Sequence, residues 1–182
     1  MQRGDLWVFG YGSLMWRPGF PFKEKRLARL DGYRRRFAMW SWHYRGTRSR
    51  PGLVLGLDWA PGESCEGMAF RVGPDDDRAV RDYLQQRELV SYAYFEIRQT
   101  VTLTDGPDQR VDALCYVLDR THEQYAGPLD PERQADVIAA ASGQSGPNAE
   151  YLISTVSHMA EIGLRDEALD GLTARVLELR RP

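Results

Sequence analysis

The apolar pattern near the N-terminus predicts a buried strand that ends in a tight loop. Leu6 to Phe9 form a short apolar run, which Gly10 to Ser13 follow before a second apolar patch. A short apolar run bounded by turn residues is typical of a buried strand. The two glycines around Tyr11 permit left-handed backbone angles and the close approach of a ligand. Because consecutive N–H groups in such a turn can converge on an anion, we expect this loop to hold an acidic substrate.

Further short segments rich in apolar and aromatic residues predict five more strands. The turn-forming pair Pro61-Gly62 separates two of them, and Asp105–Asp108 form a turn between the last two. The acidic residues after Pro74 would be stabilised by the positive end of a helix dipole, so a helix is predicted to begin there. We expect this helix to end at Glu88. The five strands are expected at residues 36–44, 53–58, 67–72, 93–103 and 111–118.

Past Asp119 the pattern becomes helical. Asp130-Pro131-Glu132 is a strong helix start, and Gly143 suits the end of that helix. Asn148 is expected to cap the next helix. A last helix is predicted from apolar residues at helical spacing, namely Leu169, Leu172, Val176 and Leu179. We therefore expect an α+β fold, a single domain over residues 1–182, with a mixed, curled or barrel-like sheet, one embedded helix and a helical C-terminal region.

Composition is consistent with a globular protein that has one well-buried core. Of the 182 residues, 42% are hydrophobic and 27% are charged, and no apolar run reaches the length of a membrane span. The N-terminus lacks the apolar core of a signal peptide. Cys65 and Cys115 are isolated thiols without metal-ligand spacing, which predicts a cytoplasmic location and no zinc site.

The net charge of −2 conceals an asymmetry along the chain. Residues 1–52 carry a balance of +9, so the remainder carries −11. A positive face could attract an anionic ligand or nucleic acid. However, nearly all of the basic residues are arginine, which favours an ordinary solvated surface in an arginine-rich proteome. Neither nucleic acid nor a membrane is expected as a partner.

Motif spacing excludes several chemistries for the loop. A nucleophile elbow around Ser13 needs glycine where Tyr11 and Met15 stand, so Ser13 is expected to be a loop donor rather than a nucleophile. No phosphate-loop or dinucleotide fingerprint occurs. The three histidines, His43, His122 and His158, are expected to be structural or surface residues. Carboxylates remain as the candidate proton carriers.

Glu88 is the outstanding carboxylate. It ends the predicted mid-chain helix and borders the apolar stripe that contains Tyr83 and Leu84. Burial and the negative helix end both disfavour ionisation, which raises the pKa toward the range of a general base, whereas the charge of Arg87 opposes that shift. A structural Arg87–Glu88 pair is the alternative, and helical periodicity favours neither interpretation.

The loop at residues 10–14 and the helix end at residues 83–88 together resemble the ChaC family of glutathione-specific γ-glutamylcyclotransferases. The similarity extends from Phe9 to the last helix, and the tyrosine-glycine-serine loop with a downstream glutamate is specific in combination. The matching motifs are residues 9–16 (FGYGSLMW), 45–47 (RGT), 51–54 (PGLV), 83–88 (YLQQRE), 125–128 (YAGP) and 145–152 (SGPNAEYL).

The resemblance implies a barrel-like fold that cleaves glutathione to 5-oxoproline and cysteinylglycine without a metal or organic cofactor. It implies that Glu88 is catalytic and moves protons while the substrate's own α-amine attacks its γ-carbonyl. The implied substrate-binding residues are Tyr11, Gly12, Ser13, Leu14, Tyr116 and Tyr151.

The sequence departs from the family pattern at two places. His43-Tyr44 replaces a common Asp-His, and Leu89–Tyr92 replaces a common Gly-Gly-Tyr. Both lie near the expected substrate region and leave the cyclisation chemistry intact. The alternatives are therefore a cyclotransferase for other γ-glutamyl amino acids or amines, and a non-catalytic binding protein on the same fold.

Overall fold

The computed structural model describes residues 5–89 and 93–181, which fall into two compact units. The first unit takes its described residues from Met1–Arg35 and Leu57–His122, and the second from Arg36–Gly56 and Glu123–Pro182. The expectation of one domain over residues 1–182 stays a prediction.

Five strands form a closed barrel in the order β1-β3-β2-β4-β5. The first strand is antiparallel to β3 and parallel to β5, so the sheet is mixed. This closed barrel confirms the barrel-like sheet that was expected for the α+β fold. The strands are β1 (Leu6–Gly10), β2 (Glu24–Ser41), β3 (Gly52–Val72), β4 (Tyr94–Leu103) and β5 (Gln109–Leu118).

The expected strands at 53–58 and 67–72 are one strand, so the prediction of two was wrong. Pro61 and Gly62 lie within β3, where both are exposed and Gly62 has a positive φ of 85°. Proline has no backbone N–H, so at an exposed position of a strand it removes no hydrogen bond that the sheet needs. Glycine adopts a positive φ without strain. The strand therefore continues through the pair instead of ending there.

The second strand begins at Glu24, twelve residues before the expected start. Its first half is rich in charged side chains, and of residues 24–34 only Ala28 and Leu30 are buried. These two positions show the period of two that belongs to a strand with one solvated face. The charges around them obscured that alternation.

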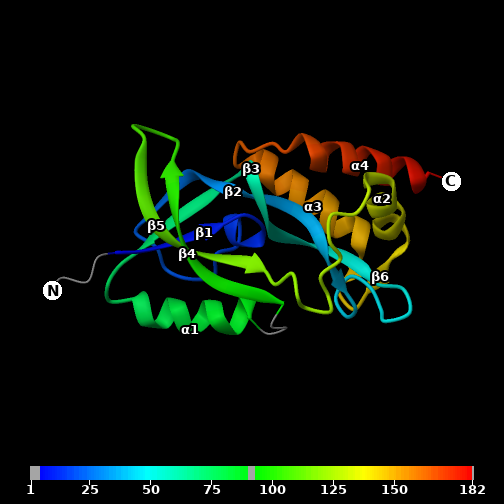
Figure 1. Ribbon diagram of the computed structural model, residues 1–182, viewed down its shortest axis with the longest axis horizontal. Helices are drawn as coiled ribbons and strands as arrows, with labels where there is room; N and C mark the ends of the chain where they lie inside the picture. Colours follow the sequence, from blue (N-terminus) through cyan, green and yellow to red (C-terminus); the bar gives the residue numbers. More distant parts are fainter. Residues whose placement is uncertain (1–4, 90–92, 182) are drawn as a thin grey trace. The chain divides into compact units, whose positions relative to one another are not determined.

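Helix α1 (Asp77–Glu88) lies between β3 and β4 in the chain and is the expected embedded helix (Figure 1). Val80 and Leu84 are its buried residues and form the stripe that packs inward. Asp77 in the first turn forms an ion pair with Arg81 one turn later. The predicted start and end of this helix are confirmed.

The second unit holds the helical C-terminal region, in which α4 contacts both α2 and α3 (Figure 1). The Asp130 side chain accepts the Glu132 N–H at 2.9 Å, as expected of an N-cap. The helices are α2 (Pro131–Ala140), α3 (Asn148–Glu161) and α4 (Glu167–Leu179), and the short strands β6 (Ser142–Gly143) and β7 (Gly146–Pro147) pair between α2 and α3.

Two helix-end predictions were wrong. Helix α2 ends at Ala140, and Gly143 lies in β6, where a Cβ would approach the His43 carbonyl oxygen to 2.5 Å. Asn148 begins α3 but does not cap it. Its fully buried side chain instead accepts the Leu53 N–H at 2.7 Å and donates to the Leu53 carbonyl at 2.8 Å. Both residues satisfy tertiary contacts that local sequence rules do not include.

None of the helices in the described ranges combines the length and apolar content that crossing a membrane requires.

Candidate active site

The loop after β1 is held against its own short helix. All five residues of β1 are buried, and the chain then turns into the 3₁₀ helix η1 (Ser13–Met15). A Cβ on Gly10 would lie 3.0 Å from the Leu14 Cβ. Glycine at this position therefore permits the close return of η1 over the end of the strand.

A buried arginine fixes the orientation of the loop. Arg35, which is 4% exposed, donates from Nε to the Tyr11 carbonyl at 2.6 Å. Because the C=O and N–H of a trans peptide point in opposite directions, the Gly12 N–H points away from Arg35. The Gly12 carbonyl accepts the Met15 N–H at 2.9 Å, which turns the Ser13 N–H away from η1. The loop thus presents amide hydrogens at the start of a helical turn, where an anion is favoured.

Ser13 is arranged as a loop residue and not as an activated nucleophile. It is exposed, and its hydroxyl oxygen accepts from Arg87 Nη2 at 2.9 Å. A guanidinium has no lone pair with which to remove a proton from the hydroxyl. This contact agrees with the sequence expectation that excluded serine catalysis.

Glu88 ends α1 as a mostly buried carboxylate. Its side chain is 19% exposed, and Oε1 lies 3.1 Å from Arg87 Nε. Burial raises the pKa of Glu88 above its usual 4.5, and the adjacent Arg87 charge opposes that rise. The direction is the one expected from the sequence. A raised pKa makes a carboxylate a stronger base, which suits general base chemistry.

Tyr116 lies on β5, opposite Glu96 on β4, and is 1% exposed. Its hydroxyl donates to Glu96 Oε2 at 2.9 Å. Burial raises the pKa of Tyr116 first, and the negative charges of Glu96 and Glu88 raise it further, so the phenol keeps its proton. The charge of one candidate residue, Glu88, thus acts on the other, Tyr116.

Sequence reasoning missed Arg35 and Glu96. The turn at Asp105–Asp108 was a usable signal for Glu96, because a hairpin folded about its midpoint brings residues near 96 opposite residues near 116. In the observed register Glu96 faces Tyr116, which is one residue away from the partner that the midpoint of the turn predicts. Arg35 left no comparable signal because its partner Tyr11 is remote in the chain.

Tyr151 belongs to the second unit, on α3. Its ring packs edge-on against Phe37 at 5.7 Å between centroids, and the Arg45 guanidinium lies 5.3 Å from the ring centroid. Its expected contact with substrate stays a prediction.

One of the two departures from the family pattern lies at residues 89–92. Of these residues, Val90–Tyr92 lie outside the described residues.

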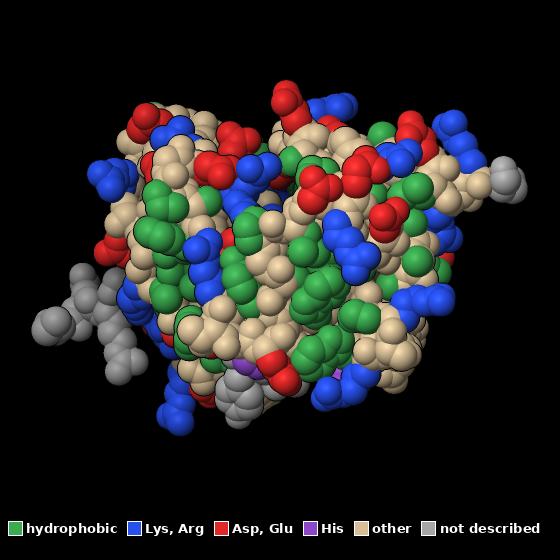
Figure 2. All heavy atoms as spheres, turned by 45° about the vertical axis from the view of Figure 1, so that its right-hand side comes forward, with side chains coloured by type: hydrophobic (Ala, Val, Ile, Leu, Met, Phe, Trp, Pro, Cys, Tyr) green, Lys and Arg blue, Asp and Glu red, His purple; other side chains and the backbone are tan. Residues whose placement is uncertain are grey.

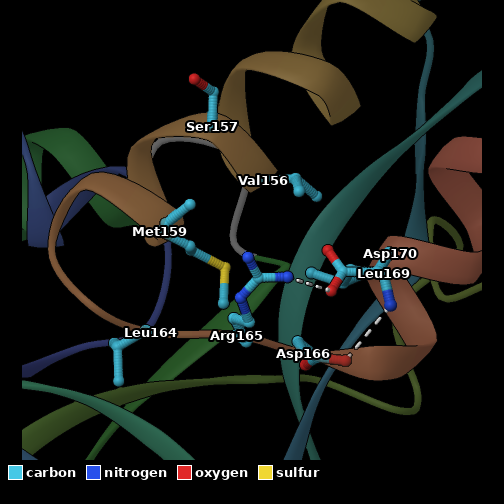
Figure 3. Close-up of a pocket in the computed structure, with 9 residues that line it drawn as sticks. Val156, Ser157, Met159, Leu164, Arg165, Asp166, Leu169 and Asp170 are labelled. Atoms are coloured by element: carbon cyan, nitrogen blue, oxygen red, sulfur yellow. Dashed lines mark hydrogen bonds and ion pairs between the residues drawn. The ribbon is translucent and has the colours of Figure 1, made fainter.

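The second unit contains a separate pocket of about 210 Å³ between α3 and α4 (Figure 3). Met159 and Leu169 line it, and Arg165 reaches across toward Asp170 at 3.9 Å. Asp166 caps α4 by accepting the Leu169 N–H at 3.2 Å. None of the predicted site residues lines this pocket.

The excess of positive charge in the N-terminal segment is partly neutralised by local ion pairs. Arg26 pairs with Glu24 and Asp105, and Arg34 pairs with Glu63. Figure 2 shows basic and acidic side chains interspersed over the face that it draws. Among the described residues, no cluster of three or more His, Cys, Asp or Glu is arranged to hold a metal ion.

Comparisons with known proteins identify the family of this chain. The model of the ChaC-like protein family matches residues 6–179. The glutathione-specific gamma-glutamylcyclotransferase of Escherichia coli (strain K12) is 34% identical over 98% of this chain and 75% of its own. The glutathione-specific gamma-glutamylcyclotransferase 1 of Homo sapiens is 37% identical over 94% of this chain and 78% of its own. The crystal structure of the yeast γ-glutamyl cyclotransferase specific to glutathione superposes with a TM-score of 0.84 at 25% identity, covering 98% of this chain and all of that one. The barrel, the loop after its first strand and the glutamate that ends α1 are thus features of a chain that belongs to the ChaC-like protein family.

Proposed function

We propose that this protein is a γ-glutamylcyclotransferase that cleaves glutathione to 5-oxoproline and cysteinylglycine. The observation that carries the proposal is a buried glutamate, Glu88, joined through Arg87 to the glycine-containing loop. A carboxylate with a raised pKa supplies the base, and the loop supplies amide donors for an anionic substrate. Membership of the ChaC-like family and the names of its curated relatives support the same reaction.

The reaction is an intramolecular acyl transfer. The substrate's α-amine attacks its own γ-carbonyl carbon, a new C–N bond closes the five-membered lactam, and the original γ-amide C–N bond breaks. Glu88 takes the proton that the attacking amine releases and returns one to the departing cysteinyl amine. Atoms and charges balance without an oxidant, a metal or an organic cofactor.

The loop binds and orients the γ-glutamyl group. Its N–H groups at Gly12, Ser13 and Leu14 hold the α-carboxylate or the oxyanion that develops on the γ-carbonyl. Holding the substrate folded on itself supplies much of the acceleration, because ring closure then needs little further loss of freedom. Tyr11, whose carbonyl Arg35 anchors, completes this binding segment.

Two tyrosines are proposed as further substrate contacts. The Tyr116 proton is directed to Glu96, so the phenol offers lone pairs and would accept a hydrogen bond from the substrate ammonium. Tyr151 lies in the block at residues 145–152 that resembles the ChaC family, and we assign it a substrate contact on that basis.

The proposal extends to the chain as a whole. The family match over residues 6–179 supports one functional domain over 1–182. The buried thiols of Cys65 and Cys115 support a reducing, cytoplasmic setting, and burial raises the pKa of Cys115 to about 12, which keeps that thiol unreactive.

The test is to incubate the purified protein with reduced glutathione and to follow the release of cysteinylglycine and 5-oxoproline. Glu88→Gln should lower kcat/KM by roughly 10²- to 10⁴-fold, as expected for loss of a general base. Asp82→Asn, which changes an exposed carboxylate on the same helix, is the matched control and should leave kcat/KM unchanged. A folded Glu88→Gln variant with full activity would eliminate Glu88 as the base.

A second candidate function is the same cyclisation of another γ-glutamyl amino acid or amine. The replacement of a family Asp-His by His43-Tyr44 favours this alternative. A panel of γ-glutamyl dipeptides and amines, compared with glutathione by kcat/KM, separates the two, because a preferred dipeptide would reverse the order. If none of the compounds in the panel is turned over, the remaining alternative is a non-catalytic binding protein on the same fold. Binding of nucleic acid that weakens steeply as the salt concentration rises would indicate a different partner.

A further inference from the structure

The Arg87 guanidinium contacts both halves of the candidate site. Its Nη2 donates to Ser13 Oγ at 2.9 Å, and its Nε lies 3.1 Å from Glu88 Oε1. Its Nη1 donates to the carbonyls of Arg17 at 2.7 Å and Pro18 at 3.0 Å. One side chain thereby bonds to η1, to the segment that follows η1 and to the carboxylate at the end of α1.

The segment after η1 is pressed closely against the same face of α1. Gly19 has a positive φ of 74°, and a Cβ there would lie 2.0 Å from the Tyr83 hydroxyl. Phe20 packs edge-on against the Tyr83 ring at 6.3 Å between centroids, and Arg87 Nη1 donates to the Tyr83 hydroxyl at 3.0 Å. The Arg87 contacts therefore lie within a close-fitting interface that only glycine at position 19 permits.

We propose that Arg87 is a positioning residue that holds the substrate-binding loop at a fixed place relative to Glu88. This inference rests on the proposed function and adds to it a device that sets the separation between the bound γ-glutamyl group and the base. Arginine suits the role because its planar fork directs several N–H groups to separate acceptors. Lysine would place a charge near Glu88 but would not span the loop and the helix in this way.

Arg87 has a second, electrostatic effect that makes the proposal measurable. Its charge lowers the pKa of Glu88 against the larger effect of burial. Among the described residues, the charge of Glu88 acts on Tyr116 on β5. Glu96 on β4, which accepts from Tyr116, and Arg81 on α1 also act on that phenol. Removing the Arg87 charge should therefore move the acid limb of kcat/KM to higher pH.

The experiment compares the wild type with Arg87→Met and Arg87→Lys, and uses Arg78→Met, an exposed arginine on the same helix, as the matched control. The kcat and KM for reduced glutathione are measured across pH, and amide hydrogen exchange is measured over residues 11–18. Arg87→Met should lower kcat/KM by roughly 10- to 100-fold, as a misplaced reacting group does, with an acid limb at higher pH and faster loop exchange. Arg87→Lys should restore the acid limb but not kcat/KM. Arg78→Met should match the wild type in every measurement.

The outcomes distinguish this proposal from the proposed function. A folded Arg87→Met variant with wild-type kcat/KM and loop exchange overturns the positioning role, and so does full rescue of kcat/KM by lysine, because charge alone would then suffice. Full activity of Glu88→Gln would instead overturn the assignment of the base. If the wild type does not turn over glutathione, the proposed function fails, and loop exchange in Arg87→Met and Arg87→Lys still decides whether Arg87 holds the loop.

Discussion

The Tyr116 hydroxyl donates to Glu96 Oε2 at 2.9 Å, between two residues that face each other across the β4–β5 ladder. The charge of Glu88, the proposed base, also acts on the Tyr116 phenol. The hydrogen bond fixes the direction of the phenol's lone pairs, and it gives Glu96 a specific partner in the barrel. We therefore expect Glu96 to contribute to the proposed site indirectly, through Tyr116.

We predict that Tyr116→Phe and Glu96→Met act on one shared interaction. Each change should lower kcat/KM by about tenfold, which corresponds to about 1.4 kcal/mol of transition-state stabilisation. The double variant should be little worse than either single one, because the same bond is removed twice. Steady-state kinetics on all three variants measures this coupling. Fully additive losses would contradict a shared role.

Stability should depend on pH through Glu88 in a defined direction. Burial raises the pKa of Glu88, so the folded state binds its proton more tightly than the unfolded state does. The stabilisation from this group is fully present below its unfolded-state pKa and is lost as pH rises through the folded-state pKa. Glu88→Gln should therefore become more stable relative to the wild type as pH increases across that window. Urea unfolding of both proteins at a series of pH values tests the sign, and a variant that loses stability relative to the wild type as pH rises would contradict it.

The acid limb of the pH profile of kcat/KM should report the ionisation of the same group, Glu88. A general base must be unprotonated, so kcat/KM should fall on the acid side at a pH above the usual 4.5 of a glutamate. A pH series for kcat/KM on reduced glutathione provides the measurement. Asp82→Asn is the control and should leave the limb in place.

Gly10→Ala should destabilise the protein, because the new methyl would lie 3.0 Å from the Leu14 Cβ under a fully buried strand. We expect a loss of about 1–3 kcal/mol in the free energy of unfolding, together with lower activity as η1 shifts. Gly171→Ala is the matched control. It lies inside α4 with nothing within 4 Å of its Cβ, so it should gain about 0.5–1 kcal/mol. Denaturant unfolding distinguishes the two, and equal effects would refute the packing argument.

Asn148→Ala should destabilise the second unit. The Asn148 amide satisfies both the N–H and the carbonyl of Leu53, and its removal would leave two buried backbone groups without that partner. The expected cost is about 1–3 kcal/mol for each group left unsatisfied. Ser157→Ala, an exposed change on the same helix, should stay within about 0.5 kcal/mol. Unfolding monitored by far-UV circular dichroism measures both, and equal stabilities would contradict the assigned role.

Local patterns predicted the elements in which each residue's own neighbours determine its conformation. The helix ending at Glu88 and the cap at Asp130 follow from charges and apolar spacing within a few residues. The long β2 was not recognised, because the barrel supplies partners that let a charge-rich segment remain extended. In β3, Pro61 and Gly62 have turn chemistry, yet the strand continues through them.

The residues of the candidate site also fall into those that local patterns predict and those that they do not. Glu88 and the loop at residues 11–14 are visible in the sequence because each is a compact motif. Arg35 and Glu96 are not, because their roles depend on partners that the barrel brings together from remote positions. Recognising them requires the strand register, which hydrophobic patterns determine to within a residue at best.

The parallel pairing of β1 with β5 joins two segments that are synthesised far apart in time. Trp7 and Val8 obtain their ladder partners Ala113 and Leu114 only after more than a hundred intervening residues have been synthesised. Contacts of such long sequence separation form slowly and late. The loop that follows β1 therefore leaves the ribosome early but acquires its complete support near the end of barrel synthesis. In a nascent chain, the proposed substrate-binding loop should become fully supported in one late step, when the first and fifth strands join.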